Sequence, residues 1–133
     1  MSASFRDLVA WQRAMALAEG AFTLARALRH GRHAGLAIQL ERAATSVPSN
    51  IAEGQGRTSG REFARFLTIA MGSLREVETL VSLAGRIGAA RNETVIALLQ
   101  MADETGRVLH GLRRSIEPSK PGRPPKPQPP TES

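Results

Sequence analysis

Residues 61–84, REFARFLTIAMGSLREVETLVSLA, give the strongest indication of the fold class, because their apolar residues recur at alternating steps of three and four. This spacing gathers apolar side chains on one face of an α-helix. We predict that the segment is one helix of a bundle and that this face packs against the neighbouring helices. The stripe consists of Phe63, Phe66, Ala70, Leu74, Val77, Val81 and Ala84.

Three further segments show the same spacing. Clusters of loop-forming residues at 30–35, 54–60 and 85–92 divide the first 117 residues into four segments. No comparable run alternates with period two, so strands are not expected. The other stripes are Leu8, Trp11, Met15, Ala18, Phe22 and Ala25 in the first segment, Leu36, Leu40, Ala43, Val47 and Ile51 in the second, and Val95, Leu98, Ala102, Thr105, Leu109, Leu112 and Ile116 in the fourth.

Four such segments joined by short loops predict an all-α fold, an antiparallel up-down-up-down four-helix bundle. The alternating steps indicate left-handed packing with a crossing angle of about 20°. Ser2 or Ser4 is expected to cap the first helix, Ser59 with Glu62 the third, and Asn92 the fourth. Within the second helix, Pro48 is expected to cause a kink rather than a restart.

Composition limits the functional classes. The chain has 133 residues and no cysteine, and its net charge is +6 from 18 basic and 12 acidic residues. No stretch approaches the ~18 apolar residues of a membrane span, and a cytoplasmic location is expected. The positive charge favours anionic partners such as RNA or DNA.

A change in composition at Pro118 predicts two regions. Seven of the eight prolines lie within residues 118–130. We therefore expect a bundle over residues 1–117 and a disordered, Pro-rich basic tail over residues 118–133. The tail is either a plain solvated segment or a short minor-groove hook. Its basic residues are Lys120, Arg123 and Lys126.

A polar stripe accompanies the apolar stripe of the second segment. Its small, hydrogen-bonding residues either satisfy backbone groups that Pro48 frees or form a buried polar seam or subunit interface. Small residues of the third segment lie one turn before Glu76 and would let helices approach closely. The candidate interface residues are Gln39, Ser46, Ser49, Asn50, Glu53, Gly72, Ser73 and Glu76.

Arginines around the second interhelical turn are the best candidates for phosphate contacts. Arg57, Arg61 and Arg65 form the run, and Arg42 and Arg75 join it if the packing brings them near. The alternative is a solvated surface, or subunit pairing with Glu62 and Glu78. No aromatic residues are interleaved for base stacking, since the aromatic residues, Phe5, Trp11, Phe22, Phe63 and Phe66, are all expected in the core.

Catalytic patterns are missing from the sequence. No Glu-x-x-His pair is present for a di-iron bundle, and GQGRTSG at 54–60 lacks the lysine of a phosphate loop. His30 and His33 are interpreted as solvated loop residues. We expect no enzymatic activity, no cofactor and no metal site.

The segments FRDLVAWQRAMALA (5–18) and GLAIQLERAATSVPSNIAEGQGRTSGREFARFLTIAMGSLREVETL (35–80) resemble the four-helix-bundle family named after proteins encoded in 23S rRNA intervening sequences. The resemblance covers about residues 5–117. It implies a bacterial, cytosolic bundle that assembles as a ring-like homopentamer without established enzymatic activity. The related accessory variability proteins of diversity-generating retroelements imply binding of nucleic acid and of a reverse transcriptase.

Two departures from the family pattern bear on function. The loop HGRHAG lacks the Pro and Glu that often precede the second helix, and Met71 stands where a basic residue is common. The leading hypothesis is an oligomeric, non-enzymatic scaffold that binds nucleic acid nonspecifically as an accessory protein. The alternative is a purely structural assembly that binds a protein partner.

Overall fold

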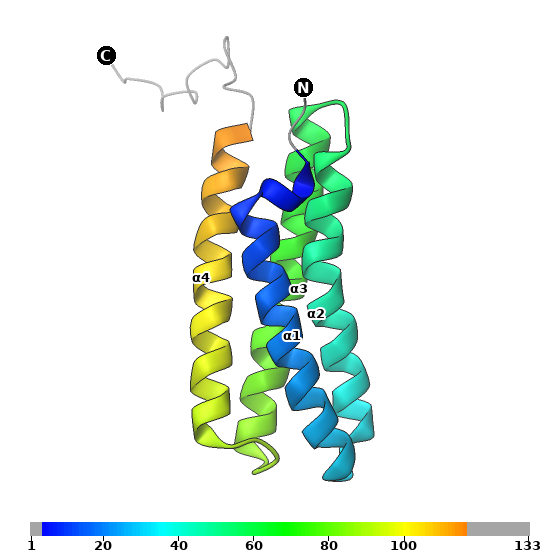
Figure 1. Ribbon diagram of the computed structural model, residues 1–133, viewed down its shortest axis with the longest axis vertical. Helices are drawn as coiled ribbons and strands as arrows, with labels where there is room; N and C mark the ends of the chain where they lie inside the picture. The colour runs from blue at the N-terminus through cyan, green and yellow to red at the C-terminus, as the bar shows by residue number, and fades with distance from the viewer. Residues whose placement is uncertain (1–3, 117–133) are drawn as a thin grey trace, which may run out of the picture.

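The computed structural model describes residues 4–116 as a bundle of four helices (Figure 1). A 3₁₀-helix and four α-helices follow one another, and the described part of the chain contains no strand. The predicted all-α four-helix bundle is confirmed. Their bounds are η1 (Phe5–Asp7), α1 (Val9–His30), α2 (Ala34–Gln55), α3 (Gly60–Arg86) and α4 (Asn92–Ile116).

Each helix packs against two others. Helix α1 contacts α2 and α4, and α3 contacts the same two helices. At one end of the bundle lie η1, the α2–α3 connection and the last turn of α4 (Figure 1). We call this the η1 end; the α1–α2 and α3–α4 connections lie at the opposite end. The left-handed crossing stays a prediction, and the tail at 118–133 lies outside the described residues.

The helix ends agree with the predicted caps at one position and differ at two. The Ser59 hydroxyl accepts a hydrogen bond from the Glu62 N–H at 3.1 Å, so Ser59 caps α3 as expected. Ser4 caps η1 instead of α1, which starts after Leu8 without a side-chain cap. Asn92 is the first residue of α4 and not its cap, because the Arg91 carbonyl already accepts from the Val95 N–H.

Helix α2 runs through Pro48 without a break. The alternative of a helix that restarts at Pro48 is therefore wrong. Proline has no N–H to donate to the carbonyl four residues earlier, which belongs to Ala44. Both residues are buried, and packing of this face against the core holds the helix together.

The core of the bundle uses the predicted stripes of α2, α3 and α4, but a different stripe of α1. Met15 and Phe22 were expected inside and are 36% and 38% exposed. Alanines on the inner face let α1 approach its neighbours closely, which leaves the larger side chains outside. The buried residues of α1 are Ala10, Ala14, Leu17, Ala21, Leu24, Ala25 and Leu28.

All the aromatic residues were expected in the core, and this expectation is wrong for some of them. Phe66 is buried, Phe5, Trp11 and Phe63 are half-buried, and Phe22 is exposed. Phe5 and Trp11 meet edge to face with ring centroids 5.4 Å apart, a favourable geometry for aromatic pairs. This contact fixes η1 against the start of α1.

A two-pronged ion pair joins α1 to α2 near the opposite end. The Arg29 guanidinium donates from Nη1 and Nη2 to the two carboxylate oxygens of Glu41. The hydrogen bond lowers the pKa of Glu41 and raises the pKa of Arg29. Both side chains are therefore charged at neutral pH. None of the four described helices is long and apolar enough to cross a bilayer.

Candidate nucleic-acid interface

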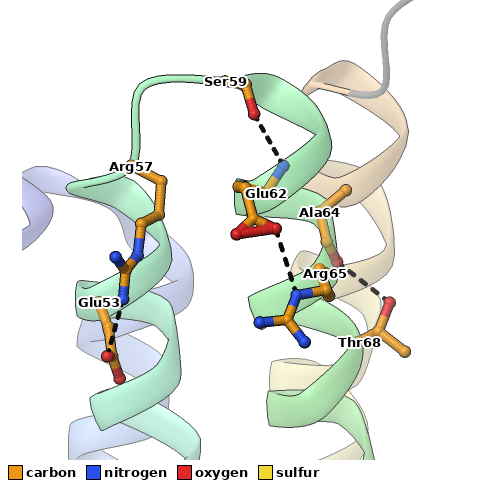
Figure 2. A network of polar contacts seen from close by, with 7 residues as sticks. All are labelled: Glu53, Arg57, Ser59, Glu62, Ala64, Arg65 and Thr68. Atoms are coloured by element: carbon orange, nitrogen blue, oxygen red, sulfur yellow. Dashed lines mark hydrogen bonds and ion pairs between the residues drawn. The ribbon is translucent and has the colours of Figure 1, made fainter.

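Three arginines lie at the α2–α3 turn or in the first turns of α3, and Figure 2 shows the two that pair with carboxylates, Arg57 and Arg65. Arg57 Nη2 lies 3.0 Å from Glu53 Oε1, four residues earlier, and Arg65 Nε lies 3.2 Å from Glu62 Oε2, three residues earlier. Such exposed pairs contribute little to stability. They do restrict where the two guanidinium groups lie.

Arg57 and Arg65 come together around a single aromatic ring. The Cζ atom of Arg57 lies 4.8 Å from the centroid of Phe66, and that of Arg65 lies 5.4 Å from it. A cation over an aromatic face within about 6 Å is attracted by the electrons of the ring. Two guanidinium groups from different segments therefore lie over the Phe66 ring. Because Phe66 is buried, its ring is not accessible for base stacking.

Arg61 differs from its two neighbours because it has no ion pair among the described residues. It is exposed in the first turn of α3. The N-terminus of a helix carries partial positive charge, so an acidic side chain such as Glu62 is favourable there and a cation is not. Helix stability therefore does not explain Arg61.

The structure does not bring Arg42 and Arg75 to this turn. Arg75 lies ten residues after Arg65 in α3, or about 15 Å along the helix axis, and pairs with Glu78 at 2.9 Å. Arg42 is exposed in α2, fifteen residues before Arg57. These two arginines therefore belong to other surfaces, and the candidate interface is reduced to the three at the turn.

Further arginines at the η1 end were not foreseen in the sequence. Because η1 and the last turn of α4 lie at the same end of the bundle as the α2–α3 turn (Figure 1), this end gathers arginines from segments distant in sequence. Only the bundle topology shows which helix ends meet. The end carries Arg6, Arg57, Arg61, Arg65, Arg113 and Arg114, together with the acidic residues Asp7, Glu53 and Glu62.

The polar stripe of α2 contributes a hydrogen-bonded group between α2 and α3. Ser73 Oγ lies 2.7 Å from Ser46 Oγ, and Asn50 Nδ2 donates to Ser46 Oγ and to the Ser46 carbonyl at 2.9 and 2.8 Å. All three side chains are half-buried. The amide of Asn50 thus bonds Ser46 and not Ala44, the residue whose carbonyl loses its partner at Pro48.

The other residues of the predicted stripe remain on the surface. Gly72 was expected to allow a close helix approach, but a Cβ at that position would have no atom within 4 Å. The close approach occurs at Gly54, which the sequence reasoning missed. The exposed members are Gln39, Ser49, Glu53, Gly72 and Glu76.

The structure also contains a groove between α1 and α2 that was not predicted from the sequence. It has a volume of about 680 Å³ and contains Trp11, Met15 and Phe22, which had been assigned to the core. The sequence did contain one indication of this groove, a second apolar stripe in α1 that is displaced by one residue from the first. Because both stripes have helical spacing, periodicity alone could not choose between them.

Residues 6–111 match the family model described as 23S rRNA-intervening sequence protein. The chain belongs to this family. The match covers most of the bundle, including the α2–α3 turn and the hydrogen-bonded group of Ser46, Asn50 and Ser73. The membership predicted from the motifs is confirmed, and the relation to retroelement accessory proteins stays a prediction. Comparison with curated proteins finds no match.

The four-helix bundle of this chain is similar to a solved structure. That structure is a crystal structure of a protein with unknown function from the S23 ribosomal protein family of Bacteroides thetaiotaomicron. The TM-score is 0.76 at 21% sequence identity, and the alignment covers 80% of this chain and 99% of that chain. The likeness shows a shared fold.

Proposed function

We propose that this member of the family is a non-enzymatic scaffold that binds the phosphate backbone of RNA or DNA through Arg57, Arg61 and Arg65. The main support is the cluster of exposed guanidinium groups at one turn. Phosphate oxygens are strong acceptors for arginine, which offers five N–H donors. A nucleic acid would bind at the η1 end, where further arginines surround the turn.

The ion pairs at the turn leave the arginines able to bind a phosphate. The side chains of Arg57 and Arg65 are 45% and 63% exposed. Each uses a single N–H in its bond to a carboxylate, so other donors face the solvent. Arg61 adds a positive charge at the N-terminal end of α3, where the helix dipole also favours an anion.

Binding through these residues would be independent of sequence. Phosphate contacts position a protein on nucleic acid but do not distinguish bases. The Phe66 ring, which could have stacked on a base, is buried beneath two guanidinium groups. We therefore expect salt-dependent binding with little preference among sequences.

The first test replaces Arg57, Arg61 and Arg65 together by glutamine in the full chain. Fluorescence anisotropy with labelled RNA and duplex DNA, across a salt series, measures the affinity. We expect weaker binding and a shallower salt dependence, because each phosphate that the protein no longer neutralises changes the slope by about 0.7–0.9. The variant should approach the parent chain at high salt, where screening weakens both.

A matched control removes the same charge from the opposite end. Arg32, Arg86 and Arg91 are exposed and form no ion pair among the described residues, and their replacement by glutamine should leave the salt slope near that of the parent. An equal decrease in affinity in both triple variants would mean that net charge, and not the η1 end, controls binding.

We propose a second function, self-assembly through the exposed outer face of α3. Gly72 is open to solvent, and Ile69, three residues earlier on the same face, is 41% exposed. The residue of α3 after Gly72, Ser73, is half-buried and donates a hydrogen bond to Ser46 of α2. The family resemblance implies a ring-like homopentamer, and this face would accommodate a neighbouring copy of the chain.

Native mass spectrometry tests the assembly. We expect an oligomer for the parent chain and smaller species for Gly72→Gln, whose side chain would occupy the space that a neighbouring copy needs. Gly111→Gln is the control, because Gly111 is equally open but lies on α4. A monomeric parent at micromolar concentration, or identical spectra for both variants, would contradict assembly through this face.

A further inference from the structure

The groove between α1 and α2 is an apolar surface that the described residues do not cover. Met15 and Phe22 line it from α1, and Pro48 and Ala52 line it from α2. Trp11 lies near its end at the start of α1, and the indole N–H has no hydrogen-bond partner among the described residues. Trp N–H groups usually find an acceptor when the ring is covered. An extended, proline-rich segment would offer free backbone carbonyl groups as acceptors for this N–H.

We propose that residues 117–133 of the same chain bind in this groove. Their sequence contains seven prolines, and such segments favour the polyproline II helix, which has no internal hydrogen bonds. Grooves lined by aromatic side chains bind this conformation because its backbone is already ordered and its carbonyl groups are free. Trp11 and Phe22 supply the aromatic surface, and the Trp11 indole supplies a donor.

The length and starting point of this segment fit the groove. Helix α4 packs against α1 and ends at Ile116, at the end of the bundle where α1 begins (Figure 1), and Trp11 lies in the first turn of α1. The groove follows α1 from Trp11 to Arg26, about 22 Å at 1.5 Å per residue. Seventeen residues in a polyproline II helix extend about 53 Å. Roughly 30 Å thus remains to cross α1, and packed helices lie only about 10 Å apart.

The charges agree with one direction of binding. Glu19, on the rim of the groove, has no ion pair among the described residues, and Arg26 lies at the end far from Trp11. In residues 117–133, Glu117 directly follows α4, the three basic residues come next, and the other acidic residue, Glu132, comes near the end. With Glu132 beside Arg26, a segment that runs from Trp11 towards Arg26 places Lys126, the last of its cations, within about 8 Å of Glu19 on the Trp11 side.

Energy transfer from Trp11 tests this proposal in the full chain. The chain has one tryptophan and no cysteine, so Gln128→Cys can carry a single acceptor dye without other changes. We expect efficient transfer that does not depend on protein concentration, because donor and acceptor belong to the same molecule. In this background, replacement of Pro124, Pro125 and Pro127 by serine should lower the transfer.

A pair of variants separates groove binding from a nearby but unbound segment. Phe22→Ser removes an aromatic wall of the groove and should lower the transfer. Leu83→Ser, at a similarly exposed apolar residue of α3, should leave it unchanged. Equal transfer in both variants would overturn the proposal, as would transfer that rises with concentration, which would assign the groove to another copy. The experiment contains no nucleic acid, so its outcome is independent of the proposed nucleic-acid binding.

Discussion

Replacing Leu17 by alanine is expected to lower the free energy of unfolding by about 2–5 kcal/mol. Leu17 is 1% exposed and belongs to the apolar core of the bundle. The substitution removes buried methyl groups and leaves a cavity, because the four helices cannot collapse around the shorter side chain. Urea denaturation at a fixed protein concentration measures the difference between the midpoints.

Met15→Ala is the matched control for Leu17→Ala. The two residues lie in the same helix, but Met15 is 36% exposed on the groove side. Its truncation should change the free energy of unfolding by less than about 1 kcal/mol. A cost for Met15→Ala equal to that of Leu17→Ala would mean that the outer stripe of α1 faces the core after all.

Gly54→Ala should also destabilise the bundle, by about 1–3 kcal/mol, through overpacking. A Cβ at Gly54 would lie 2.7 Å from Phe66 Cβ and 2.9 Å from Phe63 Cδ1. The first of these atoms is attached directly to the backbone of α3, so the clash is relieved only if the two helices separate. This cost exceeds the advantage in helix propensity, up to about 1 kcal/mol, that alanine has over glycine.

Gly111→Ala provides the comparison in a helix with open space around the glycine. A Cβ at Gly111 has no atom within 4 Å, so helix propensity should stabilise the variant by up to about 1 kcal/mol. The two substitutions are thus expected to shift the denaturation midpoint in opposite directions. A stabilising Gly54→Ala would show that α2 and α3 can separate at this point without destabilising the bundle.

The role of Gly54 also explains why the candidate interface has its geometry. The absence of a side chain at Gly54 lets α2 approach α3 where Phe63 and Phe66 lie. That approach brings Arg57, which follows α2, to the same ring as Arg65 of α3. The glycine and the phenylalanine were visible in the sequence, but their contact was not, because it depends on the register between two helices.

Features that depend on neighbouring residues could be predicted from the sequence. Helical spacing predicted four helices, and the Ser59–Glu62 pattern predicted the start of α3. The stripes of α2, α3 and α4 also predicted the faces that turn inward. These features are local, because periodicity and capping involve residues within a few turns of each other.

The arrangement of the basic residues was only partly predictable. The sequence placed Arg57, Arg61 and Arg65 around one turn, which the structure bears out. It left the positions of Arg42 and Arg75 open. In the structure, Arg42 in α2 and Arg75 in α3 lie several helical turns away from the α2–α3 turn. The sequence did not show that Arg6 and Arg114 lie at the same end as the turn. Their segments are distant from it in sequence, and only the bundle topology places them there.

The sequence by itself thus determined the number of helices, their approximate bounds and the composition of the turn that carries the arginines. Only the tertiary structure decided which stripe of α1 faces the core and which remains in the groove with Met15 and Phe22. Both stripes satisfy the same period, so the choice depends on how closely the neighbouring helices approach. Small side chains such as Ala14 permit that close approach, and close packing then buries them in place of the larger residues.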